Sequence, residues 1–347
     1  MLREIGCAAL AFWLSMNAVP VAAQYPVDQD GVAIEEEMET AKTSVAPLFD
    51  ESEAQFAADR WRSAQTASLY AEQPDPGHCS AGVLRPEAAL AFVRALNALR
   101  ALHGLAPVRY NVAAEREAGA AALMMAANNA LSHDPPPSWT CWTATGAAAA
   151  GSSNLLMGVS SAYSALENDN AILAEWLIEG NGDEIGHRRW LLDPYLEQTA
   201  LGRFTAVLHG GVRVDSVVMK VFDFPSEPPN QAEAAVPIPD FVGWPQGDYP
   251  SVFFSPSARL SFSVSQNPVE GDTPAQVDFS QAKVSISDGE RIVPVRDKLW
   301  DNEGYGVANC LSWRMDGIYP NRMYSVEISG LRGAPLDRYR YSFRIVR

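Results

Sequence analysis

A proline-rich segment divides the chain into two stretches of different periodicity. Prolines recur in residues 225–240, at Pro225, Pro228, Pro229, Pro237 and Pro239. Before this segment, apolar residues recur every three or four positions, which is typical of helices. After it, apolar and polar residues alternate in short runs, which is typical of strands. The sequence therefore predicts two domains joined by a Pro-rich linker over residues 225–240.

Length and charge agree with this division and narrow the range of partners. A chain of 347 residues is long enough for two domains, each with its own core. Its net charge of −16 argues against nucleic acid, because binding the phosphate backbone needs a stripe of lysines and arginines. The largest basic cluster is the pair Arg188 and Arg189. We therefore expect no nucleic-acid partner.

The first residues have the pattern of a secretory signal. Arg3 precedes an apolar stretch over residues 5–19, and the small residues Val21, Ala22 and Ala23 form a cleavage site. Interruptions in this stretch are Ser15, Asn17 and Pro20. Because a membrane-spanning helix needs roughly 20 apolar residues, we expect a signal peptide over residues 1–23 and no stable transmembrane segment after its cleavage. The predicted localisation is secreted or periplasmic.

Cleavage of this signal would leave three cysteines in an oxidising compartment: Cys79, Cys141 and Cys310. Cys79 and Cys141 flank one helical region, and a disulfide between them would stabilise the fold by about 4 kcal/mol. Cys310 would then be a free, buried thiol. A cysteine nucleophile would need an activating base, and no short-range Cys-His arrangement suggests one.

Residues 24–76 and 77–224 differ in pattern. The first segment is acidic, with Glu35 to Glu37 and few basic residues, and it predicts a flexible arm. In the second, the pattern predicts helices from Pro86 to Gly104, over residues 113–130, and from an Asp169-Asn170 cap to Gly180. Two strand patterns, residues 201–208 and 212–222, then predict a hairpin. The domain at residues 77–224 is therefore expected to be of the α+β class.

The residues after the linker predict a β-sandwich of immunoglobulin-like type over residues 241–347. The expected strands are residues 260–264, 283–286, 291–295, 323–328 and 339–346. An inter-sheet disulfide is not expected, because Cys310 is the only cysteine in this half. This domain would serve as a spacer or a second binding module.

Candidate site residues gather around the segment from Glu179 to Pro194, in which an acid and a glycine-rich turn precede His187. Glu179 is expected in the last turn of a helix, where the helix dipole disfavours an anion by about 0.3–1 kcal/mol. A second histidine, His133, lies on a loop that three consecutive prolines keep from being helical. Two imidazoles and a carboxylate can bind zinc and leave a fourth position to water. His133 and His187 are therefore candidate metal ligands.

The order of several short motifs resembles the CAP superfamily, the SCP/PR-1-like group of cysteine-rich secretory, antigen 5 and pathogenesis-related proteins. These motifs are Asn97-x-x-Arg100, Gly104-Leu105-x-Pro107-Val108, Leu131-Ser132-His133, Ser153-Asn154-Leu155, Trp176-x-x-Glu179, Gly186-His187-Arg188, Leu191-Leu192-x-Pro194 and Gly202. The resemblance covers roughly residues 85–224 and is to the bacterial branch, in which the domain is often exported and followed by a β-domain. It implies a three-layer α-β-α sandwich with a central cleft that holds two histidines and two acidic residues.

The resemblance also assigns positions in this cleft. His133 matches the first histidine, Glu179 the second acid and His187 the second histidine. Ser153, beside Asn154, occupies the place where the family has a glutamate. The implied cleft set is therefore His133, Ser153, Asn154, Glu179 and His187, with one carboxylate missing. Loss of such a carboxylate commonly weakens metal affinity roughly 10- to 100-fold.

Three hypotheses for the function follow. The first is a secreted, non-catalytic protein that binds a small amphipathic ligand, lipid- or sterol-like, or an extracellular protein or cell surface. The alternative is a zinc-dependent, peptidase-like hydrolase, in which His133 and His187 hold a zinc-bound water and Glu179 is the general base. In the third, both histidines only stabilise the core.

Further alternatives concern residues around this set. Asp134, Asp183 or Glu184 could supply the missing carboxylate, and a Ser153-His187-Glu179 relay is another use of the same residues. Arg188 and Arg189 are expected to form salt bridges with Asp183 or Glu184. Trp176, Trp190, Leu191 and Leu192 are expected in the core.

Overall fold

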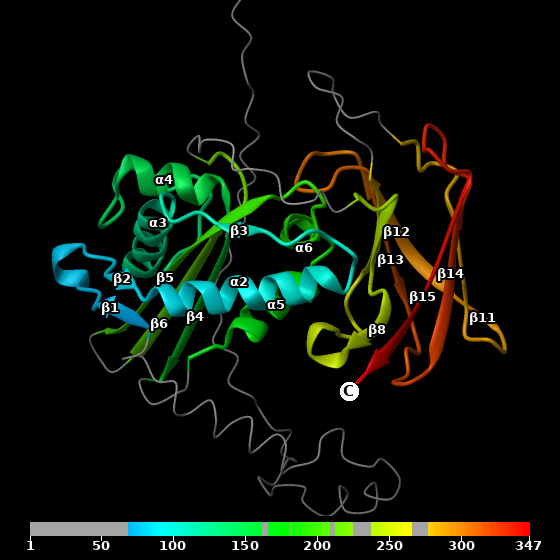
Figure 1. Cartoon of the computed structure of the whole chain (residues 1–347), viewed down its shortest axis with the longest axis horizontal. Coiled ribbons are helices and arrows are strands. Elements are labelled where there is room, and N and C mark those ends of the chain that lie inside the picture. Colours follow the sequence, from blue (N-terminus) through cyan, green and yellow to red (C-terminus); the bar gives the residue numbers. More distant parts are fainter. Residues whose placement is uncertain (1–68, 162–165, 181, 209–211, 225–236, 266–276) are drawn as a thin grey trace, which may run out of the picture. The chain divides into compact units, whose positions relative to one another are not determined.

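The computed structural model describes residues 69–161, 166–180, 182–208, 212–224, 237–265 and 277–347 (Figure 1). The predicted signal peptide lies outside the described residues. So do the predicted arm up to residue 68 and most of the predicted linker, residues 225–236. Among the described residues, no helix has the length and apolar character needed to cross a membrane.

The region before the linker, here called the α/β region, mixes helices and strands. Its helices are α2 (Pro86–Ala101), α3 (Glu115–Asn128), α4 (Ala144–Gly151), α5 (Asp169–Ile178) and α6 (Gly186–Leu191). Its strands are β1 (Tyr70–Glu72), β2 (Val83–Leu84), β3 (Arg109–Tyr110), β4 (Ser153–Ser161), β5 (Gln198–Leu208) and β6 (Val212–Lys220). The three predicted helices correspond to α2, α3 and α5, and the predicted strands to β5 and β6.

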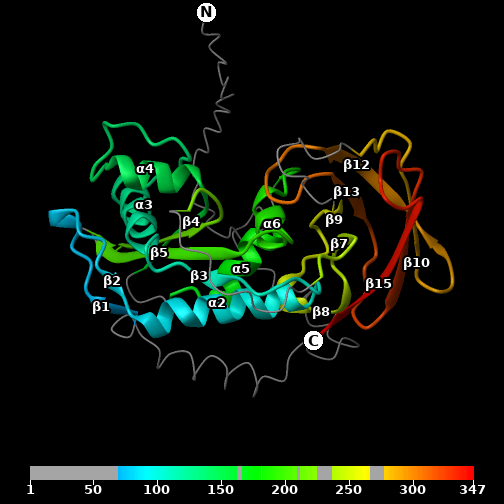
Figure 2. The ribbon, with the colours of Figure 1, turned by 45° about the horizontal axis from the view of Figure 1, so that its top comes forward.

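A four-stranded sheet with the order β3-β5-β6-β4 forms the centre of this region. β5 and β6 pair antiparallel as a hairpin, and β4 pairs antiparallel with the other edge of β6. Alternate residues of β6 enter different cores: Val214 and Val218 pack with α3 and α4, whereas Val217 and Met219 pack with α2 and α5. Helices therefore cover both faces of the sheet (Figure 2).

The sequence of each helix explains its place. Pro86 stands in the first turn of α2, where its missing N–H leaves no helical bond unmade. In the apolar stripe of α2, Val93, Leu96 and Leu99 are buried, whereas Leu90 is exposed. α3 lies directly against β5, since a Cβ atom on Gly202 would come 2.0 Å from the Ala118 carbonyl oxygen. The N-cap of α5 is Asn168 rather than the expected Asp169-Asn170 pair, because the Asn168 carboxamide accepts from Ala171 N–H at 2.8 Å.

Asn97 and Arg100, two motif residues on α2, tie loops to that helix. The Asn97 carboxamide donates to the Val108 carbonyl at 3.0 Å and accepts from the Val108 N–H at 2.8 Å. The fully buried Arg100 guanidinium donates to the carbonyls of Leu191 and Asp193, each at 2.9 Å. A buried cation requires such acceptors, so Arg100 fixes the turn that follows α6.

Tyr70 lies in β1, within the residues assigned above to the acidic arm, and its side chain is buried. Its hydroxyl donates to the Arg203 carbonyl at 3.0 Å and accepts from Thr205 N–H at 2.8 Å. β1 is thereby attached to β5.

The region after the linker, here called the β region, consists of two sheets. Its strands are β7 (Phe241–Trp244), β8 (Gly247–Pro250), β9 (Leu260–Val264), β10 (Lys283–Ser287), β11 (Ile292–Val293), β12 (Val295–Asp301), β13 (Cys310–Met315), β14 (Met323–Ser329) and β15 (Arg338–Val346). One sheet has the order β11-β10-β14-β15-β8 and the other β12-β13-β9-β7. The pairing is antiparallel except between β15 and β8, which run parallel.

Four of the five predicted strands of this half correspond to β9, β10, β14 and β15. The predicted strand at residues 291–295 is instead divided between β11 and the start of β12, which lie in different sheets. The sequence pattern missed β7, β8, the rest of β12 and β13. β13 is buried at successive positions, from Cys310 to Trp313. It pairs with β9 on one side and β12 on the other. A strand covered on both faces has no alternation of polar and apolar residues, so periodicity alone does not reveal it.

The α/β and β regions share a continuous core. A single cluster of buried residues includes Phe92 and Trp176 from the first region and Trp244 and Trp313 from the second. His103, which follows α2, is buried where they meet: its Nδ1 lies 2.9 Å from the Gly243 carbonyl oxygen and its Nε2 3.2 Å from the Tyr249 hydroxyl.

The predicted disulfide is confirmed: Cys79 and Cys141 are bonded, across a sequence separation of 62. The free thiol of Cys310 is buried, as expected. Burial raises the pKa of the Cys310 thiol, which disfavours the nucleophilic thiolate.

Replacing both Cys79 and Cys141 by serine should lower the free energy of unfolding by about 4 kcal/mol, because the unfolded chain regains the entropy of an open loop. Urea denaturation of the variant and the native protein measures this difference. Reductant should destabilise the native protein and leave the variant unchanged. A variant as stable as the native protein would contradict the structural role of this bond.

His103 should make the protein sensitive to acid. Burial, together with the charges of Arg100 and Arg188, lowers the pKa of His103 to about 3. The unfolded chain binds a proton at this histidine below about pH 6.5 and the folded chain only below about pH 3, so stability is lost as the pH falls through this window. The loss attributable to His103 should be about 1.4 kcal/mol per pH unit.

Urea denaturation at several values between pH 6.5 and 4.5 tests this, with His103→Gln as the comparison. The glutamine variant should have a shallower dependence of stability on pH than the native protein. Equal slopes for the native protein and His103→Gln would contradict the prediction.

Candidate functional site

Glu179 ends α5 and also caps the start of α6. Its backbone is left-handed, with φ of 46°, which is uncommon for a residue with a side chain. Its carboxylate turns toward α6: Oε1 accepts from His187 N–H at 3.0 Å, and Oε2 accepts from Arg188 N–H at 3.2 Å. The carboxylate therefore lies at the positive end of α6, which offsets the unfavourable position at the end of α5.

His187 is bound to the same carboxylate through its ring. Its Nδ1 lies 2.9 Å from Oε1 of Glu179, and 36% of its side chain is exposed. Its backbone carbonyl accepts from Nδ2 of Asn154 at 3.1 Å. Glu179 binds the His187 ring through Nδ1, so Nε2 is the ring nitrogen left to contact a ligand. The structure brings together three of the predicted site residues: Asn154 from β4, Glu179 and His187.

His133 is held separately, on the loop between α3 and α4. Its Nδ1 lies 2.9 Å from the carbonyl oxygen of Ala150. Burial lowers the pKa of His133, and the charge of His187 contributes in the same direction. Burial therefore favours the neutral form of His133.

Ser153 does not form the relay considered above. Its side chain is buried, and its hydroxyl donates to the Ala149 carbonyl at 2.6 Å rather than to His187. A serine that follows a helix commonly bonds back to the carbonyl four residues earlier. Ser153 is the first residue of β4, and its hydroxyl is bonded to the end of α4.

The described residues do not fit a catalytic zinc ion. Within these parts of the chain, no three His, Cys, Asp or Glu side chains are arranged to hold a metal. Asp183, one candidate for the missing carboxylate, instead forms ion pairs with Arg259 and Arg314. His133 and His187 would provide two nitrogen ligands, whereas catalytic zinc sites have three protein ligands.

Arg188 and Arg189 contact the β region, which corrects the expected salt bridges to Asp183 or Glu184. The Arg189 guanidinium binds the Asp301 carboxylate at 2.7 Å and donates to the Val307 carbonyl at 3.0 Å. Arg188 is buried and donates to the Arg259 carbonyl at 2.7 Å. Sequence reasoning missed these contacts because the partners are distant in the chain.

A stacked aromatic pair lies beside this group. The rings of Trp190 and Phe222 are 5.0 Å apart with an interplanar angle of 25°, and 42% of Phe222 is exposed. Trp190 follows His187 by three positions in α6, so both lie on one side of that helix. The backbone N–H of Phe222 donates to the Ser152 carbonyl, next to Ser153. Trp190, which was expected in the core, is partly buried and packs against the core. Its three-residue spacing from His187 is the sequence signal that places both side chains on one side of α6.

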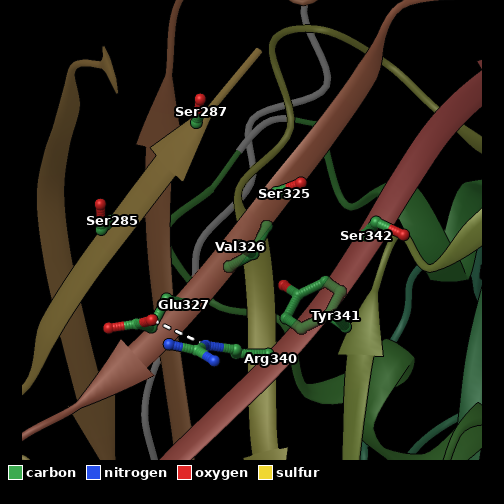
Figure 3. A pocket seen from close by; sticks show the side chains of 8 residues that line it. All are labelled: Ser285, Ser287, Ser325, Val326, Glu327, Arg340, Tyr341 and Ser342. Carbon is green, nitrogen blue, oxygen red and sulfur yellow. Dashed lines mark hydrogen bonds and ion pairs between the residues drawn. The ribbon is translucent and has the colours of Figure 1, made fainter. Parts of the chain in front are cut away.

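A shallow polar hollow of about 440 Å³ lies on the five-stranded sheet of the β region (Figure 3). Its lining residues are Ser285, Ser287, Ser325, Val326, Glu327, Arg340, Tyr341 and Ser342. The Glu327 carboxylate accepts from Arg340 at 2.8 Å and pairs with Arg338 at 3.5 Å. Its charged groups thus neutralise one another, and none of the predicted site residues lines it.

Comparison with known proteins identifies the α/β region. No curated protein and no solved structure matches the chain. One family model does match, that of the cysteine-rich secretory protein family, CAP, over residues 93–205. This range includes His133, Ser153, Asn154, Glu179 and His187. Residues 93–205 therefore form a domain of the CAP family.

Proposed function

We propose that the protein is exported and that its CAP domain binds a small amphipathic ligand, lipid- or sterol-like, without catalysing a reaction. The observation that carries this proposal is the half-exposed stack of Trp190 and Phe222 beside the Glu179–His187 pair. The Nε2 atom of the partly exposed His187 imidazole can hydrogen-bond a polar head group. The faces of two stacked aromatic rings can pack against the hydrocarbon part of such a ligand.

Chemical considerations favour binding over catalysis. A serine nucleophile needs a base within hydrogen-bond reach, and the Ser153 hydroxyl is bonded to Ala149. The alternative, a zinc-dependent hydrolase using His133, His187 and Glu179, needs a further ligand, and the Glu179 carboxylate already accepts three hydrogen bonds. Membership in a fold family does not itself support an enzymatic function.

Export is supported by the disulfide between Cys79 and Cys141. Disulfides persist in oxidising compartments and are rare in the cytosol. Together with the signal pattern over residues 1–23, this favours a secreted or periplasmic protein. We also propose that the β region is an immunoglobulin-like sandwich, for which its two sheets give support.

The aromatic stack provides the test. Purified protein is incubated with a mixture of palmitic acid, cholesterol and phosphatidylethanolamine, passed through gel filtration and analysed by native mass spectrometry. The native protein should retain a ligand. Phe222→Ser should reduce the affinity about 10-fold or more, because it removes one of the two stacked rings and its apolar contact. Tyr319→Ser changes an exposed aromatic residue of the β region and should bind as the native protein does.

Other outcomes would contradict the proposal. If the native protein retained none of these lipids but bound to a cell surface, a surface partner would replace the amphipathic ligand. Near-stoichiometric zinc in the purified sample, with a zinc-dependent rise in melting temperature, would favour the hydrolase. Equal retention by the native protein and Phe222→Ser would remove the aromatic stack from the site.

A further inference from the structure

The segment just before His187 is attached to the β region by two arginines. The Asp183 carboxylate accepts from Nη1 of Arg259 at 2.9 Å and lies 3.3 Å from Nη2 of Arg314. The same Nη2 donates to the carbonyl of Gly182 at 3.1 Å. Arg314 therefore binds the side chain of one loop residue and the backbone of its neighbour, which fixes the loop more closely than a single ion pair would.

The residue just after His187 is attached to the same sheet. The Arg188 guanidinium donates to the carbonyl of Arg259 at 2.7 Å and to the hydroxyl of Ser261 at 3.2 Å. It also lies 3.8 Å from the centre of the Trp244 ring. His187 thus stands between two points of attachment to β7, β9 and β13.

The two arginines are held within their own sheet. Arg259 is buried, donates to the Ser312 hydroxyl at 3.0 Å and also contacts the Asp297 carbonyl. Arg314 donates through Nη1 to the Ser257 carbonyl at 2.6 Å. A buried guanidinium is costly without an anion, and Asp183 supplies one to Arg259. Both guanidinium groups therefore have defined positions from which to bind the loop.

We propose that the sheet β12-β13-β9-β7 positions the Glu179–His187 pair, and that Arg314 is a positioning residue for it. The backbone N–H groups of His187 and Arg188 both donate to the Glu179 carboxylate. Their distance from Glu179 depends on the path of the loop that Arg314 holds. The β region thus acts on the candidate site through the loop that carries Gly182 and Asp183. The predicted cleft residues themselves all belong to the α/β region.

Hydrogen exchange of the full chain, read at single amides by NMR, tests this without any ligand. In Arg314→Met, the amides of His187 and Arg188 should exchange about 2- to 10-fold faster than in the native protein. This is a modest effect, because the side chain of Asp183 is 68% exposed and such pairs are weak. The amides of β5 and β6 should keep their native rates.

Three further variants separate positioning from stability. Asp183→Ala should reproduce the effect of Arg314→Met, and Arg314→Lys should restore part of the protection. Arg340→Met removes an ion-paired arginine from the other sheet and should leave the amides of His187 and Arg188 unchanged. The 15N signals of the His187 imidazole should shift in Arg314→Met. In Arg340→Met they should stay as in the native protein.

Two results would overturn the proposal. One is that the amides of His187 and Arg188 exchange at native rates in folded Asp183→Ala and Arg314→Met. The other is an equal acceleration at β5 and β6, which would assign the contact to overall stability. Neither result bears on lipid retention, so failure of this proposal is distinguishable from failure of the proposed function.

Discussion

The carboxylate of Glu179 joins two helices and an imidazole at one point. It accepts from two backbone N–H groups at the start of α6 and contacts Nδ1 of His187. Arg188 connects the same two helices in the opposite direction: its guanidinium donates to the carbonyls of Leu177 and Ile178 at the end of α5. Each helix end therefore supplies what the other lacks: an anion for free N–H groups and a cation for free carbonyls. This reciprocal capping fixes the direction of the His187 ring.

The same arrangement makes the β region part of the fold around the site. Arg188 is buried, so its remaining donors need acceptors, and these are the Arg259 carbonyl and Ser261 hydroxyl. His103 makes a second buried polar contact with this region, and the apolar core is continuous across the boundary. The expectation of a spacer or a second binding module did not include these contacts. The β region contacts the loop before His187 through Arg259 and Arg314.

The elements that could be predicted from the sequence are those with local signals. Pro86 and the apolar stripe after it indicated α2, and the two cysteines around one helical region indicated the disulfide. Of the site, the order of motifs indicated a cleft set that includes Glu179 and His187, and the structure joins these two. β13 was missed because it is buried on both faces. The contacts of Arg188 with Arg259 and Ser261 were missed because these residues lie 71 and 73 positions away in the chain. Contacts between residues far apart in the chain produce no periodic pattern in the sequence.

Calorimetric unfolding of the full chain tests most directly whether the α/β region and the β region form one structural unit around the site. The shared core and the buried contacts of Arg188 and His103 predict a single cooperative transition, with equal calorimetric and van't Hoff enthalpies. Two separate transitions, one for each region, would contradict the account.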